Sequence, residues 1–347
     1  MKTVIHLIST DVFSGAENVA CQIINSFKKN NKDYKMIYVS KIGPNKKNLE
    51  DRSITYYELD KFNYKSIKKA VEKIQPDIIH AHDTKAIIMA SLFHKKAKIV
   101  GHIHANHENL RTKTLKSILL NYFSKYVSKM IWISKSALEN YYYYNNIESK
   151  SVVLYNMINF NEIISKVKED KNNYNFDIIY LGRMTYQKNP ERFIEIVKEI
   201  KEKYPALKVA MVGTGDLDDE IKKLIREYNL SSTIKFYGFK DNPYKILQSS
   251  KLMMITSRYE GTPMCALEAF ACGIPIISTP ADGLNDIIDN QKTGFLSNDN
   301  KKIIDYVIKL LTEKKTLNML KENVRKKNKQ INNIIFYKNE IKKIYTE

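Results

Sequence analysis

The chain has 347 residues, more than one hydrophobic core usually spans, so we expect two domains. Hydrophobic residues make up 43% of it, which excludes a globally disordered chain. The net charge of +19 is uneven: basic and acidic side chains number 25 and 13 in residues 1–150, 19 and 20 in residues 151–300, and 13 and 5 in residues 301–347. This predicts a basic face on the first half and the tail, for an anionic membrane surface, an anionic glycan or a nucleic acid.

The first half alternates short apolar stretches with amphipathic ones. The apolar stretches are rich in β-branched residues and continuously hydrophobic, which is typical of a parallel sheet buried on both faces. In chain order we expect strands at Val4–Ser9, Met36–Ser40, Asp77–Ala81 and Lys98–His104, and helices at Ala16–Lys28, Lys65–Ile74 and Thr114–Met130.

The second half repeats this rhythm after a polar stretch, Ser165–Asn175, which we interpret as a linker. Two such series predict an α/β fold of two Rossmann-like, doubly wound parallel-sheet domains facing a central crevice. The expected domains are residues 1–165 and 176–330, with a helix at 331–347 that packs back on the first. We expect strands at Phe176–Leu181, Leu207–Val212, Ile234–Tyr237, Leu252–Thr256 and Pro275–Ser278, and helices at Pro190–Lys203, Asp218–Tyr228 and Met264–Cys272.

The most informative segment spans residues 258–283 (RYEGTPMCALEAFACGIPIISTPADG). It puts Glu260 on a loop after a strand and Glu268 eight residues later, inside the following helix. The first N–H groups of that helix lack internal partners and are open to an anion. A sugar nucleotide needs amides for its diphosphate and carboxylates for its ribose and sugar hydroxyls. Taken alone, the two glutamates also fit an ordinary turn and an ordinary helix surface.

Two further strand ends carry residues of the same kind. Gly182 and Arg183 follow a strand, and Lys188 comes five residues after the arginine. Arginine binds phosphate as a bidentate fork and lysine as a point charge. The next strand ends in VGTG, where Gly213 lets the backbone come close to a ligand. Because ligands bind at the carboxyl ends of parallel strands, three such ends together predict a diphosphate site.

As a set, these residues resemble retaining glycosyltransferases of the large GT4 group, which have the GT-B fold. The shared pattern is GR-x4-K, VGTG and E-G-T-P-x4-E-A-x3-G-x-P, and it covers most of the second half. The resemblance implies that Glu260 contacts the transferred sugar and Glu268 the ribose. Pro263 departs from the glycine of many members and has no N–H to donate. The implied donor-binding residues are Gly15, Arg183, Lys188, Gly213, Phe239, Gly261, Thr262, Met264, Cys265 and Glu268.

The first half adds a loop and two histidine pairs. Ser14–Glu17 is by itself an ordinary strand–helix turn, but it resembles the family's GG-x-E loop, with Ser14 replacing the first glycine. The pairs are His80 with His82 and His102 with His104, and each pair shares a strand face. No cysteine or carboxylate completes a convincing zinc spacing, so we expect no metal. The resemblance implies that His104, like Glu260, acts at the reacting sugar, and His82 is a candidate on the acceptor side.

The predicted helix Thr114–Met130 has an apolar stripe beside several lysines. One interpretation is a helix packed on the core with a solvated basic face. The other is a helix that docks on anionic lipid to reach a lipid-linked acceptor, which the basic charge of residues 1–150 favours. The apolar stripe consists of Leu115, Ile118, Leu119, Tyr122, Tyr126 and Met130.

The three cysteines, Cys21, Cys265 and Cys272, form no disulfide framework and indicate buried thiols in a reducing compartment. The apolar first ten residues contain His6 and run into a turn, so we interpret them as a strand rather than a signal peptide. Apolar runs stay well short of the roughly 20 residues that span a bilayer. We expect a cytoplasmic protein, either free or peripheral on the inner face of the cell membrane.

The sequence therefore predicts transfer of a sugar from a nucleotide-diphosphate sugar, with UDP favoured, to a hydroxyl of a glycan or polyprenyl-linked acceptor, with retention. The resemblance places this reaction in cell-surface polysaccharide or glycolipid synthesis. Arg183 and Lys188 would stabilise the departing diphosphate, so no cofactor or metal is expected. Two alternatives stay open: a GT-B nucleotide-sugar epimerase, and a non-enzymatic polyanion or nucleic-acid binder. We expect no nucleic-acid partner, because no groove-reading or aromatic-basic repeat is visible.

Overall fold

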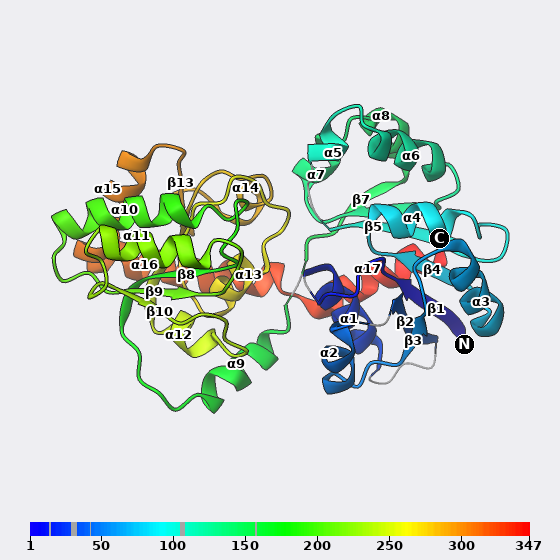
Figure 1. Cartoon of the computed structure of the whole chain (residues 1–347), viewed down its shortest axis with the longest axis horizontal. Helices are drawn as coiled ribbons and strands as arrows, with labels where there is room; N and C mark the ends of the chain where they lie inside the picture. Colours follow the sequence, from blue (N-terminus) through cyan, green and yellow to red (C-terminus); the bar gives the residue numbers. More distant parts are fainter. Residues whose placement is uncertain (14, 29–32, 42, 105–107, 157) are drawn as a thin grey trace. The chain divides into compact units, whose positions relative to one another are not determined.

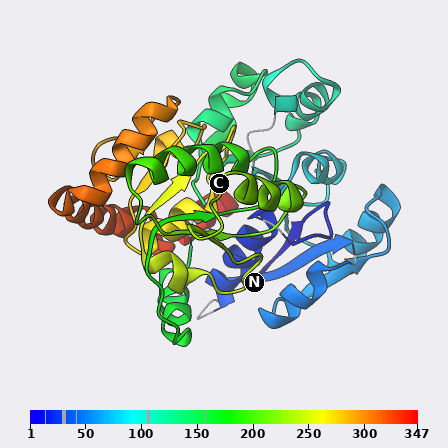
Figure 2. The ribbon, with the colours of Figure 1, turned by 60° about the vertical axis from the view of Figure 1, so that its left-hand side comes forward.

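The computed structural model describes residues 1–13, 15–28, 33–41, 43–104, 108–156 and 158–347. It contains two compact units: the first comprises Met1–Met157 and Asn333–Glu347, and the second comprises Ile158–Asn332. Each unit is a parallel sheet with helices on both faces (Figures 1 and 2). The predicted fold class, an α/β protein of two Rossmann-like parallel-sheet domains, is confirmed.

The first unit is built on a seven-stranded sheet in the order β3-β2-β1-β4-β5-β6-β7. Neighbouring strands pair in parallel, and the chain turns outward from β1 in both directions, as in a doubly wound sheet. The strands are β1 (Lys2–Leu7), β2 (Tyr34–Lys41), β3 (Tyr56–Leu59), β4 (Ile78–Ala81), β5 (Lys98–Ile103), β6 (Lys129–Trp132) and β7 (Ser151–Val153). The helices are α1 (Gly15–Lys28), α2 (Asn45–Asp51), α3 (Tyr64–Ile74), α4 (Thr84–Ser91), α5 (Glu108–Arg111), α6 (Leu115–Ser124), α7 (Lys135–Glu139), α8 (Tyr144–Ile147), the 3-10 turn η1 (Glu148–Lys150) and α17 (Ile334–Thr346).

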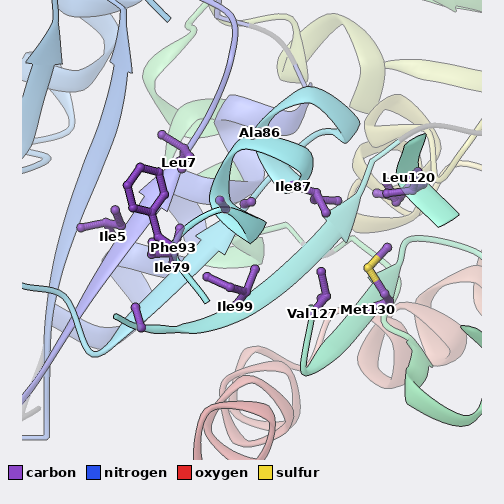
Figure 3. Close-up of a cluster of buried hydrophobic side chains, with 14 of the residues drawn as sticks. Ile5, Leu7, Ile79, Ala86, Ile87, Phe93, Ile99, Leu120, Val127 and Met130 are labelled. Atoms are coloured by element: carbon purple, nitrogen blue, oxygen red, sulfur yellow. The ribbon is translucent and has the colours of Figure 1, made fainter. Parts of the chain in front are cut away.

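The two faces of this first sheet differ in chemistry. One face is aliphatic and packs against α3, α4 and α6, as the cluster around Ile79, Ile99 and Met130 illustrates (Figure 3). Because side chains alternate along a strand, the intervening residues of β1, β4 and β5 point to the other face, and several of these are histidines. On that face α17 returns beside α1, and its Tyr345 is buried against His80.

The second unit has a six-stranded parallel sheet in the order β10-β9-β8-β11-β12-β13. Both of its faces are apolar, and separate hydrophobic clusters lie beneath the two helix layers. The strands are β8 (Phe176–Leu181), β9 (Val209–Val212), β10 (Ile234–Phe236), β11 (Ser250–Ile255), β12 (Ile276–Ser278) and β13 (Gly294–Leu296). The helices are α9 (Phe160–Glu169), α10 (Pro190–Lys203), α11 (Asp218–Glu227), α12 (Tyr244–Gln248), α13 (Met264–Ala271), α14 (Leu284–Ile287), α15 (Asn300–Thr312) and α16 (Lys314–Ile331).

The predicted helix Thr114–Met130 is shorter than expected. A capping box at Thr114 starts α6, but the helix ends at Ser124, and Met130 lies on β6. The four-residue spacing from Tyr122 to Tyr126 and Met130 imitates a helical stripe although it crosses from helix to strand. Val127 and Met130 are buried in the aliphatic core beside Leu120 of α6 (Figure 3).

The predicted linker Ser165–Asn175 also differs from the structure. Its first five residues belong to α9, which begins after the cap Asn159. Ile163 and Val167, four residues apart, bury that helix against the second unit, whereas residues 170–175 form no regular element. The chain therefore enters the second unit at Ile158, before the expected boundary at residue 165, and re-enters the first at Asn333.

Candidate active site

In the second unit, the three predicted strand ends are neighbours in the sheet, because β9, β8 and β11 lie side by side with β12 next in order. The first two loops touch directly: Gly213 has a φ of +133°, and a Cβ atom there would lie 1.9 Å from the carbonyl oxygen of Gly182. A side chain at residue 213 would force these loops apart, so glycine is required by the packing itself.

An ion pair joins the β8 loop to the β11 loop. Lys188 Nζ lies 2.6 Å from Glu260 Oε1, and the Glu260 side chain is only 4% exposed. Burial is the largest single influence and acts to lower the pKa of Lys188, but the charge of Glu260, the nearby Cys265 and the hydrogen bond to Glu260 together raise it. The two residues that the sequence assigns to diphosphate and sugar are thus in contact and both charged.

Further contacts fix the segment around Glu260. Ser257 Oγ donates to the same Oε1 atom at 2.6 Å, and the Glu260 N–H donates to Asp282 Oδ2 at 3.2 Å. Gln187 Nε2 donates to the Tyr259 carbonyl at 3.1 Å. Sequence reasoning missed these three partners. Asp282 could have been found, because it follows the next predicted strand, but nothing in the sequence marks Ser257 or Gln187.

The first turn of α13 faces the same loops. Its N-cap is Pro263, with no side-chain cap, and the amides of Met264 and Cys265 occupy the turn where a helix supplies no acceptors. Thr262 is buried, and Gly261 is half-buried. Burial, together with the nearby charges of Glu260 and Glu268, raises the pKa of the Cys265 thiol to about 12, although Lys188 acts against this. Cys265 is therefore an unreactive neutral thiol.

Glu268 lies one helical turn further along α13 and is half-buried. Tyr244 Oη donates to its Oε1 atom at 3.3 Å. Burial raises the pKa of Glu268 to about 7, although Tyr244, Lys166 and Lys188 each favour the charged form. This carboxyl group therefore changes charge near neutral pH.

Two predicted donor residues are exposed. Arg183 projects from the end of β8, and its Nη2 atom donates to Gln187 Oε1 at 3.5 Å. Phe239 follows Gly238, whose φ is +66°, and 69% of Phe239 is exposed. The Gly213 N–H donates to the Gly238 carbonyl, so the exposed ring lies beside the loop after β9, where it can stack against a planar group.

The first unit gathers five histidines on one face of its sheet. His6 of β1 pairs in register with His80 of β4, and the rings of His102 and His104 lie 3.9 Å apart between centroids. Two hydrogen-bonded chains run through the cluster. One joins Tyr345, His80 and His102 at 2.8 and 3.3 Å, and the other joins His6, His82 and His104 at 2.9 Å each.

Burial lowers the pKa of every member of this cluster. The pKa values of His6 and His104 fall to about 3, and those of the other three also lie well below 6.5. His104 is therefore a neutral imidazole near neutral pH. Its Nδ1 atom has no hydrogen-bond partner among the described residues, so it can donate or accept according to its tautomer.

Two groups of three histidines are close enough to suggest a metal site: His6, His80 and His82, and His82, His102 and His104. Two nitrogen ligands about 2.05 Å from a tetrahedral zinc would lie about 3.3 Å apart. The contacts from His6 to His82 and from His82 to His104 are 2.9 Å, the separation of a hydrogen bond. The geometry is thus that of a hydrogen-bonded chain, and metal independence stays a prediction.

Gly15 is exposed at the start of α1, whereas Ser14 lies outside the described residues. A Cβ atom at residue 15 would meet no other described part of the chain within 4 Å, its chain neighbours aside. Packing among the described residues therefore does not require glycine here.

Comparison with known proteins assigns both units to the same enzyme class. Residues 161–327 match the model of glycosyl transferases group 1, and residues 13–162 match that of glycosyltransferase family 4. The chain belongs to this family of glycosyltransferases with the GT-B fold. None of its helices in the described part of the chain is long and apolar enough to cross a membrane.

The relatives extend over much of the chain. An uncharacterized glycosyltransferase of Methanocaldococcus jannaschii is 28% identical over 64% of this chain and 60% of its own length. The UDP-Gal:alpha-D-GlcNAc-diphosphoundecaprenol alpha-1,3-galactosyltransferase of Escherichia coli is 27% identical over 81% of this chain and 78% of its own. The crystal structure of Anabaena HepE in complex with UDP covers all of both chains with a TM-score of 0.87 at 16% identity, and so supports the fold.

Proposed function

We propose that the chain transfers a hexosyl residue from a UDP-sugar to a hydroxyl group, with retention at the anomeric carbon. The observation that carries the proposal is the buried Lys188–Glu260 pair beside the uncapped first turn of α13, at neighbouring strand ends. The similarity to HepE, whose structure contains UDP, and to a relative that uses UDP-Gal supports UDP as the nucleotide.

The departing diphosphate is stabilised electrostatically in this proposal. Arg183 and Lys188 supply positive charge, and the amides of Met264 and Cys265 supply oriented donors, with Gly261 and Thr262 shaping the turn before them. Before the donor binds, the Lys188 ammonium is paired with the Glu260 carboxylate, which keeps it in place. In this proposal Arg183, Lys188 and the two amides take the place of a divalent cation at the diphosphate, so we expect the reaction to need no metal.

The other donor contacts follow from the surrounding loops. Glu260 orients the transferred sugar, Glu268 accepts hydrogen bonds from the ribose hydroxyls, and Phe239 stacks on the base. Gly213 lets the loop after β9 pack directly against the loop after β8, which leaves room above both loops for the diphosphate. A ribose diol donates to a carboxylate, so Glu268 binds best in its charged form.

The first unit supplies neutral groups. Gly15 leaves room for the donor phosphates, and His104 contacts the transferred sugar by a hydrogen bond, because its lowered pKa excludes an imidazolium acting as an acid. His82 binds His104 and is fully buried, so we assign it to orienting His104 rather than to direct contact with an acceptor.

The proposed acceptor is a glycan or a polyprenyl-linked glycan at the inner face of the cell membrane. The E. coli relative acts on a diphosphoundecaprenol-linked sugar. The α6 helix turns Ser117, Leu120 and Ser124 inward, whereas Leu115, Ile118 and Tyr122 are exposed. Lys125 lies over the Tyr122 ring at 3.9 Å, so this apolar stripe has a basic rim, the pattern of a helix that lies on anionic lipid.

The test is turnover of UDP-glucose, UDP-galactose and UDP-N-acetylglucosamine with and without an undecaprenyl-diphosphate-linked sugar, with NMR of the product's anomeric configuration. We expect one donor to give an acceptor-dependent product with its configuration retained. Interconversion of UDP-sugars without acceptor would identify an epimerase instead. Calorimetry with UDP that gives no heat, beside tight binding of DNA, would favour a polyanion binder.

A further inference from the structure

We propose that Gln187 and Asp282 are positioning residues that clamp the peptide bond between Tyr259 and Glu260. The carbonyl oxygen of this peptide accepts from Gln187 Nε2 at 3.1 Å, and its N–H donates to Asp282 Oδ2 at 3.2 Å. Because a peptide bond is planar, holding both ends fixes the plane that leads into the Glu260 Cα atom. The inference rests on the proposed function, in which the Glu260 carboxylate contacts the transferred sugar.

The two halves of the clamp come from strand ends on opposite sides of the Glu260 loop. Gln187 belongs to the loop after β8, which also carries Arg183 and Lys188, and Asp282 to the loop after β12. The Gln187 side chain uses both ends of its amide, because its Oε1 atom accepts from Arg183 Nη2 at 3.5 Å. One glutamine thus couples the guanidinium assigned to the diphosphate with the peptide that leads to Glu260.

The backbone at Asp282 indicates that its side chain is needed there. Its φ is +44°, in the left-handed region where glycine is favoured and aspartate and asparagine are tolerated better than most residues. Glycine would suit this backbone best. What aspartate adds is the carboxylate that accepts the Glu260 N–H.

The carboxylate of Glu260 depends on this backbone position because its own contacts are short. Its Oε1 atom accepts from Ser257 Oγ and from Lys188 Nζ, both at 2.6 Å. A tilt of the peptide plane would move the carboxylate away from both donors and from the sugar. Misplacement of a catalytic group by about 1 Å can lower a rate about 100-fold.

The experiment compares variants that break the clamp with variants that keep it. Asp282→Gly removes the acceptor but relaxes the backbone, whereas Asp282→Asn keeps an acceptor oxygen and tolerates the left-handed region. Gln187→Glu keeps the acceptor for Arg183 but cannot donate to the Tyr259 carbonyl. Asn285→Ala, exposed and close to Asp282 in the chain, is the matched control.

The measurements are turnover of the best UDP-hexose among the three named, the dissociation constant of UDP, and the melting temperature. For Asp282→Gly and Gln187→Glu we expect kcat to fall about 10- to 100-fold, with the UDP constant within about threefold and melting within about 3 °C of wild type. Asp282→Asn should keep at least about a third of the wild-type kcat, and Asn285→Ala nearly all of it.

Wild-type kcat in both clamp-breaking variants would overturn the inference. So would a loss of UDP affinity in proportion to kcat, because the two residues would then hold the donor rather than position Glu260. Glu260→Ala separates this failure from failure of the proposed function. Wild-type turnover in Glu260→Ala would contradict the proposed function. Loss of turnover in Glu260→Ala, together with wild-type turnover in the two clamp-breaking variants, would contradict only the clamp.

Discussion

The two units carry buried polar groups at the ends of their parallel strands, but they accommodate them in opposite ways. The second unit keeps Lys188 and Glu260 charged by pairing them. The first unit holds five histidines, four of them buried and His104 half-buried, which are hydrogen-bonded to one another and whose lowered pKa values keep them neutral. One fold therefore offers two chemistries: fixed charge suited to a diphosphate, and uncharged donors and acceptors suited to sugar hydroxyls.

The contrast extends to the pH dependence of stability. The histidines have folded pKa values below 6.5, so the unfolded first unit binds more protons and the free energy of unfolding falls as pH drops below 6.5. Glu268 in the second unit has a raised pKa of about 7. Its contribution to the free energy of unfolding is therefore lost as the pH rises through 7, rather than as the pH falls. The two units should thus reach their greatest stability at different pH values.

The largest expected effect is acid unfolding of the first unit. Below pH 6.5, each cluster histidine contributes a slope of up to about 1.4 kcal/mol per pH unit to the free energy of unfolding. For five histidines the upper limit is about 7 kcal/mol per pH unit. The single tryptophan, Trp132, is buried on β6, so its fluorescence reports this unit alone. We expect steep loss of the folded signal between pH 6 and 4. A His94→Gln control, outside the cluster, should unfold like wild type, and a flat profile in this range would contradict the neutral cluster.

Next in size is removal of the lysine from the buried pair. Lys188→Ala leaves Glu260 without its counter-charge and takes a positive charge from the diphosphate, so we expect turnover of the UDP-sugar to fall about 1000-fold. Lys251→Ala is the matched control, because Lys251 pairs with Asp177 at 2.8 Å near the opposite ends of β11 and β8. Comparable losses in both variants would mean that general stability, rather than the site, sets the rate.

A smaller effect follows from the titration of Glu268. With a pKa of about 7, the carboxylate fraction rises about tenfold between pH 6 and pH 8, and UDP affinity should rise with it. Glu268→Gln should bind UDP more weakly, and its UDP affinity should lack the rise with pH that comes from Glu268. Any pH dependence that persists in this variant comes from titration of the nucleotide itself. Identical pH profiles for the two proteins in calorimetry would remove Glu268 from the ribose site.

The smallest effect concerns the exposed face of α6. The double variant Leu115→Ser, Tyr122→Ser should lower binding to phosphatidylglycerol-containing vesicles about threefold or more in sedimentation assays, while binding to phosphatidylcholine stays low. Met319→Ser, an exposed apolar residue of the second unit, is the control. Equal partitioning of wild type to neutral and anionic vesicles would remove the proposed membrane contact.

Much of the second unit could be predicted from sequence, because its candidate site residues follow apolar strands. Residues at the carboxyl ends of adjacent strands must converge, so the proximity of the loops that carry Arg183, Lys188, Gly213 and Glu260 could be predicted without knowing any contact. Asp282 follows the next predicted strand and could have been found by the same rule, whereas nothing in the sequence marks Gln187, because its contact with the Tyr259 backbone leaves no trace in the pattern of residue types.

The first unit was harder to predict. The spacing of the histidines predicts that each pair shares one strand face. It does not predict the burial that lowers their pKa values, or that β1 adds His6 to the cluster. The predicted helix Thr114–Met130 is longer than α6 because the apolar spacing of a helix continues from α6 into β6. Its stripe was also ambiguous: the same apolar spacing describes a helix facing the core and one facing outward, and only burial of Ser117, Leu120 and Ser124 distinguishes them.

The return of α17 to the first unit has a consequence for synthesis on the ribosome. The second unit is contiguous in sequence, so it can close its core while the tail is still being translated. The first unit lacks α17, which packs beside α1, until residues 333–347 emerge, and Tyr345 of that helix completes the hydrogen-bonded chain through His80 and His102. The half of the protein that is translated first is thus the last to be finished.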